Sequence, residues 1–145
     1  MTYPWHSVQL SSGDYTVSHG RSPGEVSVVG VDGRVVQRYT QSLTSDIGQM
    51  KHPRSLAVTK NDILVADEGH DRIVLIKRST GCIEELALSV DCGILRPRAL
   101  CLDESRGRLC VGEFGGERRV WSCDCVGQMH AVRTAYTVAS YIFNF

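Results

Sequence analysis

Arginine, histidine and aromatic side chains recur at related places along this chain, and together they have the chemistry of a ligand-binding surface. The first group follows three prolines and comprises Trp5, His6, Arg54 and Arg98. The second group lies further along the same three segments and comprises His19, Arg21, Glu68, His70 and Phe114. Arginine pairs with carboxylate or phosphate, whereas aromatic rings stack on bases or fill pockets. The two groups therefore predict a binding surface for a peptide or for single-stranded RNA.

The same residues also have structural interpretations. Trp5 could pack between neighbouring units, and Arg54 and Arg98 could bond loop carbonyls or neighbouring acids. His19 and His70 supply only two imidazoles, too few for a typical zinc site, so we expect both to be solvated loop histidines.

All six cysteines lie in the second half of the chain. Because the N-terminus lacks the basic and apolar regions of a secretion signal, we expect reduced thiols rather than disulfides. Cys101 and Cys110 fall in expected strands, where cysteine behaves as a small core residue. Cys123, Cys125 and His130 have the chemistry of zinc ligands, but no CxxC pair accompanies them. We therefore predict no metal and no cofactor.

Short strands must position these side chains. In residues 53–78, apolar runs at 56–58, 63–66 and 73–76 are rich in β-branched and aliphatic residues and are separated by turn-forming sequences. Runs this short and this close together predict neighbouring antiparallel strands.

The segment that begins at Pro53 is repeated upstream from Pro4 and downstream from Pro97. The prolines lie 49 residues (53 minus 4) and 44 residues (97 minus 53) apart. A period in the forties with about four strands per unit is typical of propeller blades. We therefore predict an all-β fold, a partial β-propeller of about three four-stranded antiparallel blades that forms half of a six-bladed ring.

The blades are expected at about 3–40, 52–89 and 96–132, within one propeller segment at 1–133. The fourth strand of the third blade is expected within 126–132, and residues 134–145 form a tail or an extra strand. Propellers close with about four to eight blades. We therefore expect the missing blades in a longer parent chain, or a second copy that closes the ring as three plus three.

The strand order predicts where the two groups of candidate residues meet. When the chain runs outward through a blade, the loop between the second and third strands emerges at the same end as the loop that opens the blade. The opening loops and the second-to-third loops therefore share one side of the ring, which we call the loop face. Loops of this kind, held by rigid strands, are suited to recognition.

One family pattern is visible in these repeats. Residues 65–73, VADEGHDRI, preceded by 53–58, PRSLAV, resemble the NHL repeat. The resemblance implies an acidic position at Asp67 and a basic position at Arg72, which we expect to form a structural clamp. The positions to which it assigns a structural role are Pro53, Asp67, Gly69, Arg72, Pro97, Glu113 and Arg119.

The resemblance extends over roughly residues 3–125 and is weakest in the first copy, where Ser18 replaces the Asp and Glu25 the Arg. The sequence pattern resembles that of the C-terminal propellers of tripartite-motif (TRIM-NHL) proteins. These proteins are similar to RING ubiquitin ligases that carry a substrate- or RNA-binding propeller. No CxxC zinc framework of a ligase half appears in this sequence. The resemblance thus implies a protein-interaction or substrate-recognition platform that lacks the RING part.

Charge and motifs narrow the expected function. Sixteen basic and sixteen acidic residues give a net charge of zero, so there is no general attraction to nucleic acid or anionic membrane. We expect a protein or peptide ligand, with single-stranded RNA as the alternative and with no DNA or membrane partner. No apolar run approaches membrane-spanning length, and the expected compartment is the cytoplasm.

An enzyme is the third alternative. Six-bladed relatives implied by the resemblance include metal-dependent hydrolases and a lyase. Because no nucleophile motif and no glycine-rich phosphate loop appears in the sequence, we expect a non-enzymatic binding module.

Overall fold

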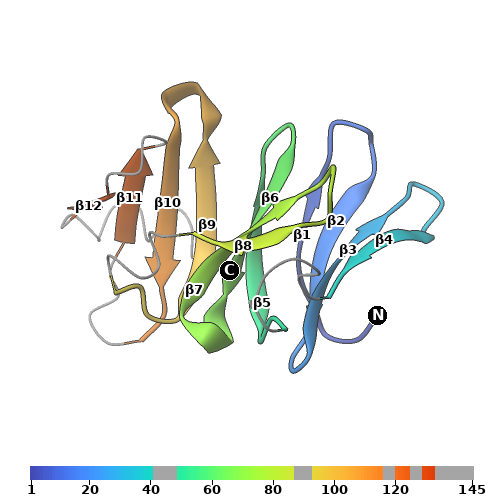
Figure 1. The fold of residues 1–145 in the computed structure, drawn as a ribbon, viewed down its shortest axis with the longest axis horizontal. Helices are drawn as coiled ribbons and strands as arrows, with labels where there is room; N and C mark the ends of the chain where they lie inside the picture. The colour runs from blue at the N-terminus through green and yellow to red at the C-terminus, as the bar shows by residue number, and fades with distance from the viewer. Residues whose placement is uncertain (41–48, 87–92, 116–119, 125–128, 133–145) are drawn as a thin grey trace.

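Three four-stranded antiparallel sheets make up the described part of the protein (Figure 1). The computed structural model describes residues 1–40, 49–86, 93–115, 120–124 and 129–132. Blade one contains β1 (Pro4–Gln9), β2 (Tyr15–Gly20), β3 (Gly24–Val29) and β4 (Val35–Tyr39). Blade two contains β5 (Pro53–Val58), β6 (Asp62–Asp67), β7 (Arg72–Lys77) and β8 (Ile83–Glu85). Blade three contains β9 (Pro97–Asp103), β10 (Arg108–Glu113), β11 (Val120–Asp124) and β12 (Met129–Val132).

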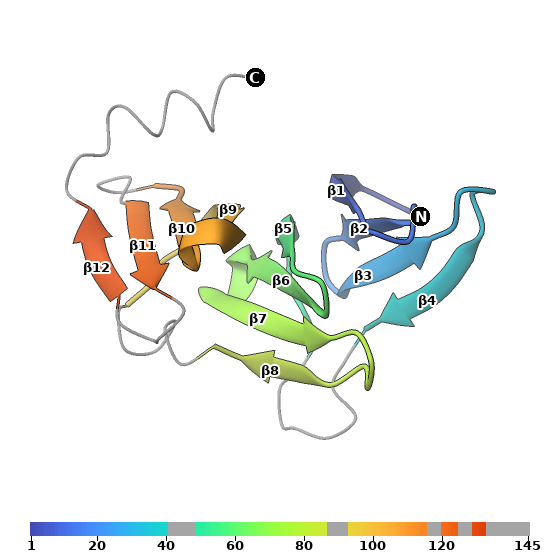
Figure 2. The ribbon, with the colours of Figure 1, turned by 90° about the horizontal axis from the view of Figure 1, so that it is seen from above.

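The blades are arranged as a partial β-propeller, which confirms the predicted fold class. Each sheet is ordered by sequence from its first to its fourth strand. Figure 2 shows the three sheets fanning out, with β1, β5 and β9 next to one another and β4, β8 and β12 on the outside. The fourth strand of blade three lies at Met129–Val132, inside the predicted range. The described outer strand of blade two, Ile83–Glu85, lies inside the expected blade range of 52–89, and residues 87–92 lie outside the described part, as do residues 134–145.

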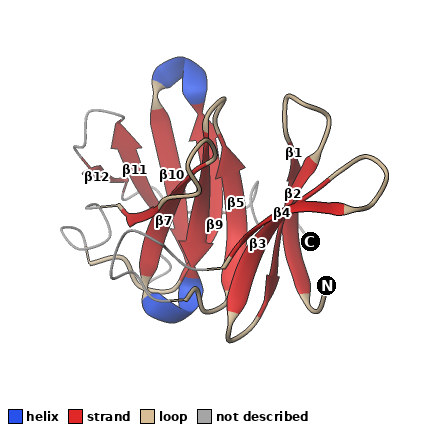
Figure 3. Cartoon of the chain, turned by 45° about the vertical axis from the view of Figure 1, so that its right-hand side comes forward, coloured by secondary structure: helices blue, strands red, loops and turns tan. Residues whose placement is uncertain are grey.

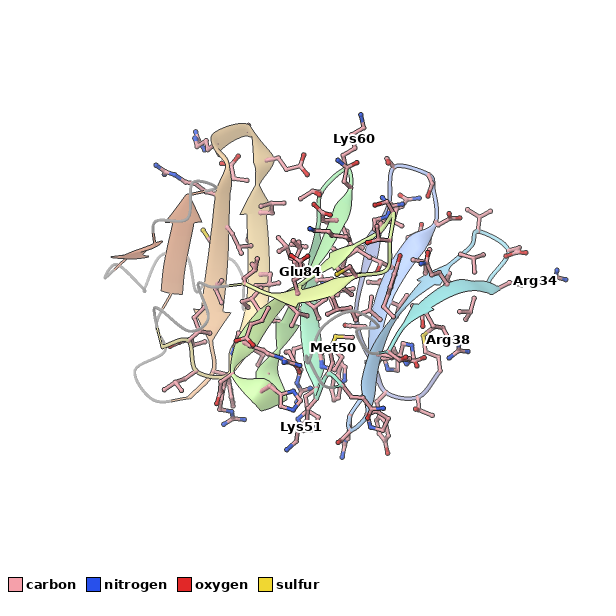
Figure 4. The ribbon with its side chains drawn as sticks, viewed as in Figure 1. Arg34, Arg38, Met50, Lys51, Lys60 and Glu84 are labelled. Atoms are coloured by element: carbon pink, nitrogen blue, oxygen red, sulfur yellow. The ribbon has the colours of Figure 1, made fainter. Side chains whose placement is uncertain are left out.

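Blade two is apolar because both of its faces are covered. Ile63 and Val65 pack in a core cluster with residues of blade one, whereas Leu64 and Ala66 pack in a second cluster with residues of blade three. Side chains of a strand alternate between its two faces, so a strand covered on both sides needs a continuous apolar run. This requirement explains the sequence of β6, whose last five residues are buried. Met50, labelled in Figure 4, closes the seam between blades one and two.

Blade one leaves one face uncovered in the described part of the chain, and we call it the open face. On the corresponding face of blade two lie Leu56, Val58 and Val74, which belong to the core between blades one and two. The antiparallel registers place Ser7, Gln9 and Ser27 at the equivalent positions of blade one. Arg38 also lies on this face, opposite Ser27 on β4, and forms an ion pair with Glu25 at 2.7 Å. Polar residues thus replace the apolar ones at three matching positions.

All three blades open with the same backbone geometry. The residues immediately before the opening prolines, Tyr3, His52 and Arg96, have φ values of 51°, 58° and 46°. Positive φ is uncommon outside glycine, so its recurrence at one repeat position marks a shared local structure. A proline also disfavours the right-handed helical conformation of the residue before it.

Backbone hydrogen bonds then join each opening loop to the loop after the second strand. The N–H of Gly20 donates to Tyr3 O, that of Glu68 to His52 O and that of Phe114 to Arg96 O, at 3.1, 3.2 and 3.0 Å. The two sets of loops therefore meet at one end of each blade, as predicted for the loop face. Figure 3 shows the 3-10 turns Glu68–His70 and Glu104–Arg106 at opposite ends of the molecule, since the first follows a second strand and the second follows a first strand.

Candidate interaction surface

A buried carboxylate supports the loop face beneath blade two. Asp67 is fully buried, and its Oδ1 accepts the N–H of Lys51 at 2.6 Å. Its Oδ2 accepts from Arg72 Nε at 2.8 Å and bonds His70 Nδ1 at 2.8 Å. The predicted clamp between Asp67 and Arg72 is therefore present, and it also fastens the opening loop through Lys51.

Gly69 belongs to the same junction, because its N–H donates to the carbonyl of Lys51 at 2.7 Å. A Cβ at this position would lie 2.6 Å from that carbonyl oxygen. The close approach of the two backbones explains the glycine of the repeat.

The clamp of blade one is reversed in polarity, and this corrects the predicted alignment. Pro53 is opposite Asp67 in the sheet, and Pro4 is opposite His19, so His19 rather than Ser18 occupies the Asp67 position. Glu25 is opposite His19 as Arg72 is opposite Asp67, with 3.1 Å between His19 Nε2 and Glu25 Oε1. Blade one therefore carries its basic group on the second strand and its acidic group on the third.

Blade three keeps the acidic member. Glu113 lies opposite Pro97, and its Oε1 accepts the N–H of Leu95, which is the counterpart of Lys51. Arg119, the predicted basic member, lies outside the described residues.

Three arginines surround a second buried carboxylate on the loop face, and we call Arg54, Arg96 and Arg98 the arginine cluster. Glu68 is buried; its Oε2 pairs with Arg54 Nε, and its Oε1 accepts from Arg96 at 3.0 Å. Burial alone would raise the pKa of Glu68, but the hydrogen bonds and charges of the three arginines outweigh burial and hold that pKa below its usual value. Glu68 was predicted as a binding residue of the loop face; the structure buries its carboxylate, which is the counter-ion of the arginine cluster.

One arginine from each blade stacks on an aromatic ring, and the ring that Arg54 of blade two contacts is Trp5 of blade one. The guanidinium of Arg21 lies 4.4 Å from the ring centre of Tyr3, that of Arg54 lies 3.7 Å from Trp5, and that of Arg98 lies 3.9 Å from Phe114. Trp5 also donates from Nε1 to Gly20 O at 2.7 Å. Such stacks leave the edge of the guanidinium available for hydrogen bonds. Five predicted residues, Trp5, Arg21, Arg54, Arg98 and Phe114, are thus brought together in stacks.

His19 and His70 were both expected to be solvated loop histidines, and the structure confirms exposure only for His70. His19 is buried and lies 2.8 Å from Ser27 Oγ, so it is not the solvated loop residue expected from sequence. Its place on a strand, one residue before the loop, explains the difference. His70 is exposed, with its ring fixed by Asp67.

His6 lies at the seam between blades one and two. Its Nδ1 accepts the backbone N–H of Leu56 at 3.0 Å, so the proton of the neutral ring lies on Nε2. In the next seam the hydroxyl of Ser55, the counterpart of His6, accepts the N–H of Leu100 at 3.1 Å. A side chain of one blade thus repeatedly bonds the first strand of the next blade.

Stability is expected to fall when acid protonates His6. Burial lowers the pKa of His6 from its ordinary value of 6.5, and a protonated Nδ1 cannot accept the Leu56 N–H. Because the folded pKa is the lower one, this contribution is fully present above about pH 6.5 and is lost as the pH falls below it. Urea unfolding at a series of pH values between 7.5 and 5 measures the effect.

A His6→Gln variant is the matched control, since its amide oxygen can still accept the bond but does not titrate. It should show a smaller loss of stability over this pH range than the native chain. Burial also lowers the pKa of His19, so part of the dependence remains in the variant. Equal pH dependence of the two proteins would contradict the assignment of His6.

Ser27, His19 and Glu25 lie together, but not as a catalytic triad. Both the serine hydroxyl and the glutamate carboxylate approach the same atom, His19 Nε2, at 2.8 and 3.1 Å. A triad requires its acid on the other ring nitrogen. Within the described residues, no group of three or more His, Cys, Asp or Glu side chains is placed to hold a metal ion.

Cysteine positions correct one further expectation. Cys82, Cys101 and Cys110 are free thiols, and Cys101 and Cys110 lie opposite each other on β9 and β10. Cys101 is exposed and Cys110 is half-buried, so they are not core residues. They lie on the side of blade three away from Leu109 and Val111, which face blade two. The side chains of Cys123, Cys125 and His130 are not described.

Tyr3 and Arg96 belong to the surface although they were not among the predicted site residues. Arg96 forms an ion pair with Glu68 at 3.0 Å, and its guanidinium carbon lies 5.2 Å from the ring centre of Phe114. Both residues directly precede an opening proline. This shared sequence position was the signal that could have identified them.

Comparisons with protein-family models and with curated proteins found no match to this chain. In the described part of the chain, no helix is long and apolar enough to cross a membrane.

Proposed function

We propose that the chain is a non-enzymatic binding module whose loop face recognises a protein or peptide. The observation that supports this proposal is the set of three arginine–aromatic stacks on the loop face, to which each blade contributes one arginine. Aromatic and arginine side chains are enriched among the residues that contribute most to protein interfaces. The surrounding strands hold these loops rigidly, which reduces the entropy lost on binding.

The resemblance of the sequence to the NHL repeat favours a role in substrate recognition. We propose that the segment serves as a substrate-recognition platform like those of TRIM-NHL ubiquitin ligases, with the ligase part elsewhere. The cytoplasm is the compartment consistent with this role. Missing blades from a parent chain, or from a second copy, would complete the ring.

A peptide library panned against the immobilised chain tests the proposal. Selected peptides should bind the Trp5→Ala and Arg54→Ala variants at least about tenfold more weakly, because each variant removes half of one stack. Val36→Ala is the control, since Val36 lies exposed on β4 and belongs to none of the stacks. Unchanged affinity in both loop-face variants, with their folds intact, would remove this surface from the proposal.

Single-stranded RNA is the second candidate, favoured by the same stacks, because bases can intercalate with aromatic and guanidinium groups. The net charge of zero weighs against it. RNA binding would weaken steeply with added salt, whereas a weak, salt-independent background would exclude it.

A further inference from the structure

The arginine cluster carries more positive charge than its buried partner can neutralise. Arg54, Arg96 and Arg98 all act on the single carboxylate of Glu68, which leaves an excess of two positive charges (three minus one). Both oxygens of that carboxylate are already engaged by Arg54 and Arg96. Arg98 is therefore attracted by Glu68 without a hydrogen bond to it among the described contacts.

The excess charge faces outward rather than into the protein. The Glu68 side chain is only 3% exposed, whereas that of Arg96 is 55% exposed. Arg98 is half-buried against Phe114, whose ring is itself 41% exposed. A molecule that approaches this part of the loop face therefore meets guanidinium groups and an aromatic ring before it meets the carboxylate.

The other acids near the cluster are also engaged. Glu113 is buried and accepts the N–H of Leu95. Asp71 is exposed, but its Oδ1 accepts the N–H of Arg96 at 2.6 Å. Lys51, on the neighbouring opening loop, adds another exposed cation. A hydrogen bond from a backbone N–H does not neutralise a carboxylate, so both acids still offset part of the positive charge. Among the exposed or half-buried groups beside Arg98, Arg96 and Lys51 are positive and Asp71 is negative.

We propose that Arg98, stacked on Phe114 within the arginine cluster, binds a carboxylate of an acidic peptide segment in the protein partner. This inference rests on the proposed function and specifies the chemistry of the ligand. A stacked guanidinium presents a fork of N–H donors that matches a carboxylate in two hydrogen bonds. On the accessible part of the cluster, Arg96, Arg98 and Lys51 outnumber Asp71 by two charges (three minus one), and two adjacent acidic side chains would balance that excess. A nucleic-acid backbone would bring one charge for every nucleotide, more than this local excess requires.

Fluorescence polarisation with a pair of short labelled peptides tests the inference. One peptide carries two adjacent glutamates in a Gly/Ser sequence, and the other carries glutamines at the same two places. We expect the glutamate peptide to bind about tenfold or more tightly than the glutamine peptide, and added salt to reduce this difference.

Variants then locate the contact. Arg98→Gln should reduce binding of the glutamate peptide about tenfold, and Arg98→Lys should be intermediate because it keeps the charge but loses the planar fork. Arg38→Gln is the matched control, since Arg38 is exposed on the open face of blade one and is paired with Glu25. Circular dichroism and thermal melting of each variant show whether its fold is intact.

The outcomes separate this inference from the proposed function. Equal binding of both peptides, with loss in Trp5→Ala, would overturn the acidic ligand while leaving peptide recognition in place. Loss of binding in Arg38→Gln equal to that in Arg98→Gln would also overturn the inference. Selective, salt-dependent binding of a single-stranded RNA oligomer that requires Arg98, without binding of the glutamate peptide, would replace both proposals by the RNA alternative.

Discussion

Asp67→Asn should lower the free energy of unfolding by about 3 kcal/mol, because removing one charge of a buried ion pair leaves the other in a poorly solvated place. Asp67 is fully buried and receives hydrogen bonds from Lys51, Arg72 and His70. An asparagine oxygen can still accept at one of the two positions, but the NH2 group at the other position would face either the N–H of Lys51 or the donors of Arg72 and His70. For a chain of this length, the melting temperature should fall by roughly 10 °C.

Asp32→Asn is the matched control for this prediction. Asp32 is exposed and accepts a backbone N–H from Arg34 in a hairpin turn. Surface changes of this kind usually alter stability by less than about 0.5 kcal/mol. Similar melting temperatures for Asp67→Asn and the native chain would show that the clamp contributes little to the fold.

Ile63→Ala is expected to destabilise the protein by about 2–5 kcal/mol, since it removes buried methyl and methylene groups and leaves a cavity. Ile63 is fully buried in the core between blades one and two. Its neighbour in the chain, Leu64, lies in the other core cluster, so Leu64→Ala tests the seam between blades two and three. Urea unfolding followed by circular dichroism measures both variants.

Val36→Ala is the control here, because Val36 is 62% exposed on β4. Its effect should stay within about 0.5 kcal/mol of zero. If both core variants shift one cooperative transition, the three blades unfold together. A cost for Ile63→Ala no larger than that for Val36→Ala would mean that blades one and two are not packed as described.

The spacing of Pro4, Pro53 and Pro97 was enough to predict the number and order of the blades, because each proline opens the first strand of a sheet. The Asp67–Arg72 clamp was also predictable, since the two residues lie at the facing ends of β6 and β7. Both predictions depend on contacts within one blade, where strand register follows directly from the sequence pattern.

Contacts between blades were not predictable in the same way. One of the ion-pair partners of Glu68 is Arg96, which lies 28 residues further along the chain, and no local sequence pattern indicates this pair. The place of His19 was missed because Gly20 follows His19 directly, whereas one further residue separates Asp67 from Gly69. Matching the two glycines therefore assigns the acidic position to Ser18. The exposure of Cys101 was missed because a strand of an outermost blade has one uncovered face.

The partly polar open face of blade one affects how well any further sheet could join the arc there. Ser7 and Gln9 would place a hydroxyl and an amide at positions where both seams inside the arc have aliphatic side chains, and Ser27 would place a hydroxyl at the position of Val74. The same face also carries the apolar residues Tyr15, Val17 and Val29. A joint of that kind gains less from excluding water, and each polar group needs a matching donor or acceptor across it. In a closed ring, we expect this interface between blades to separate before the two described seams when the protein is heated or pulled.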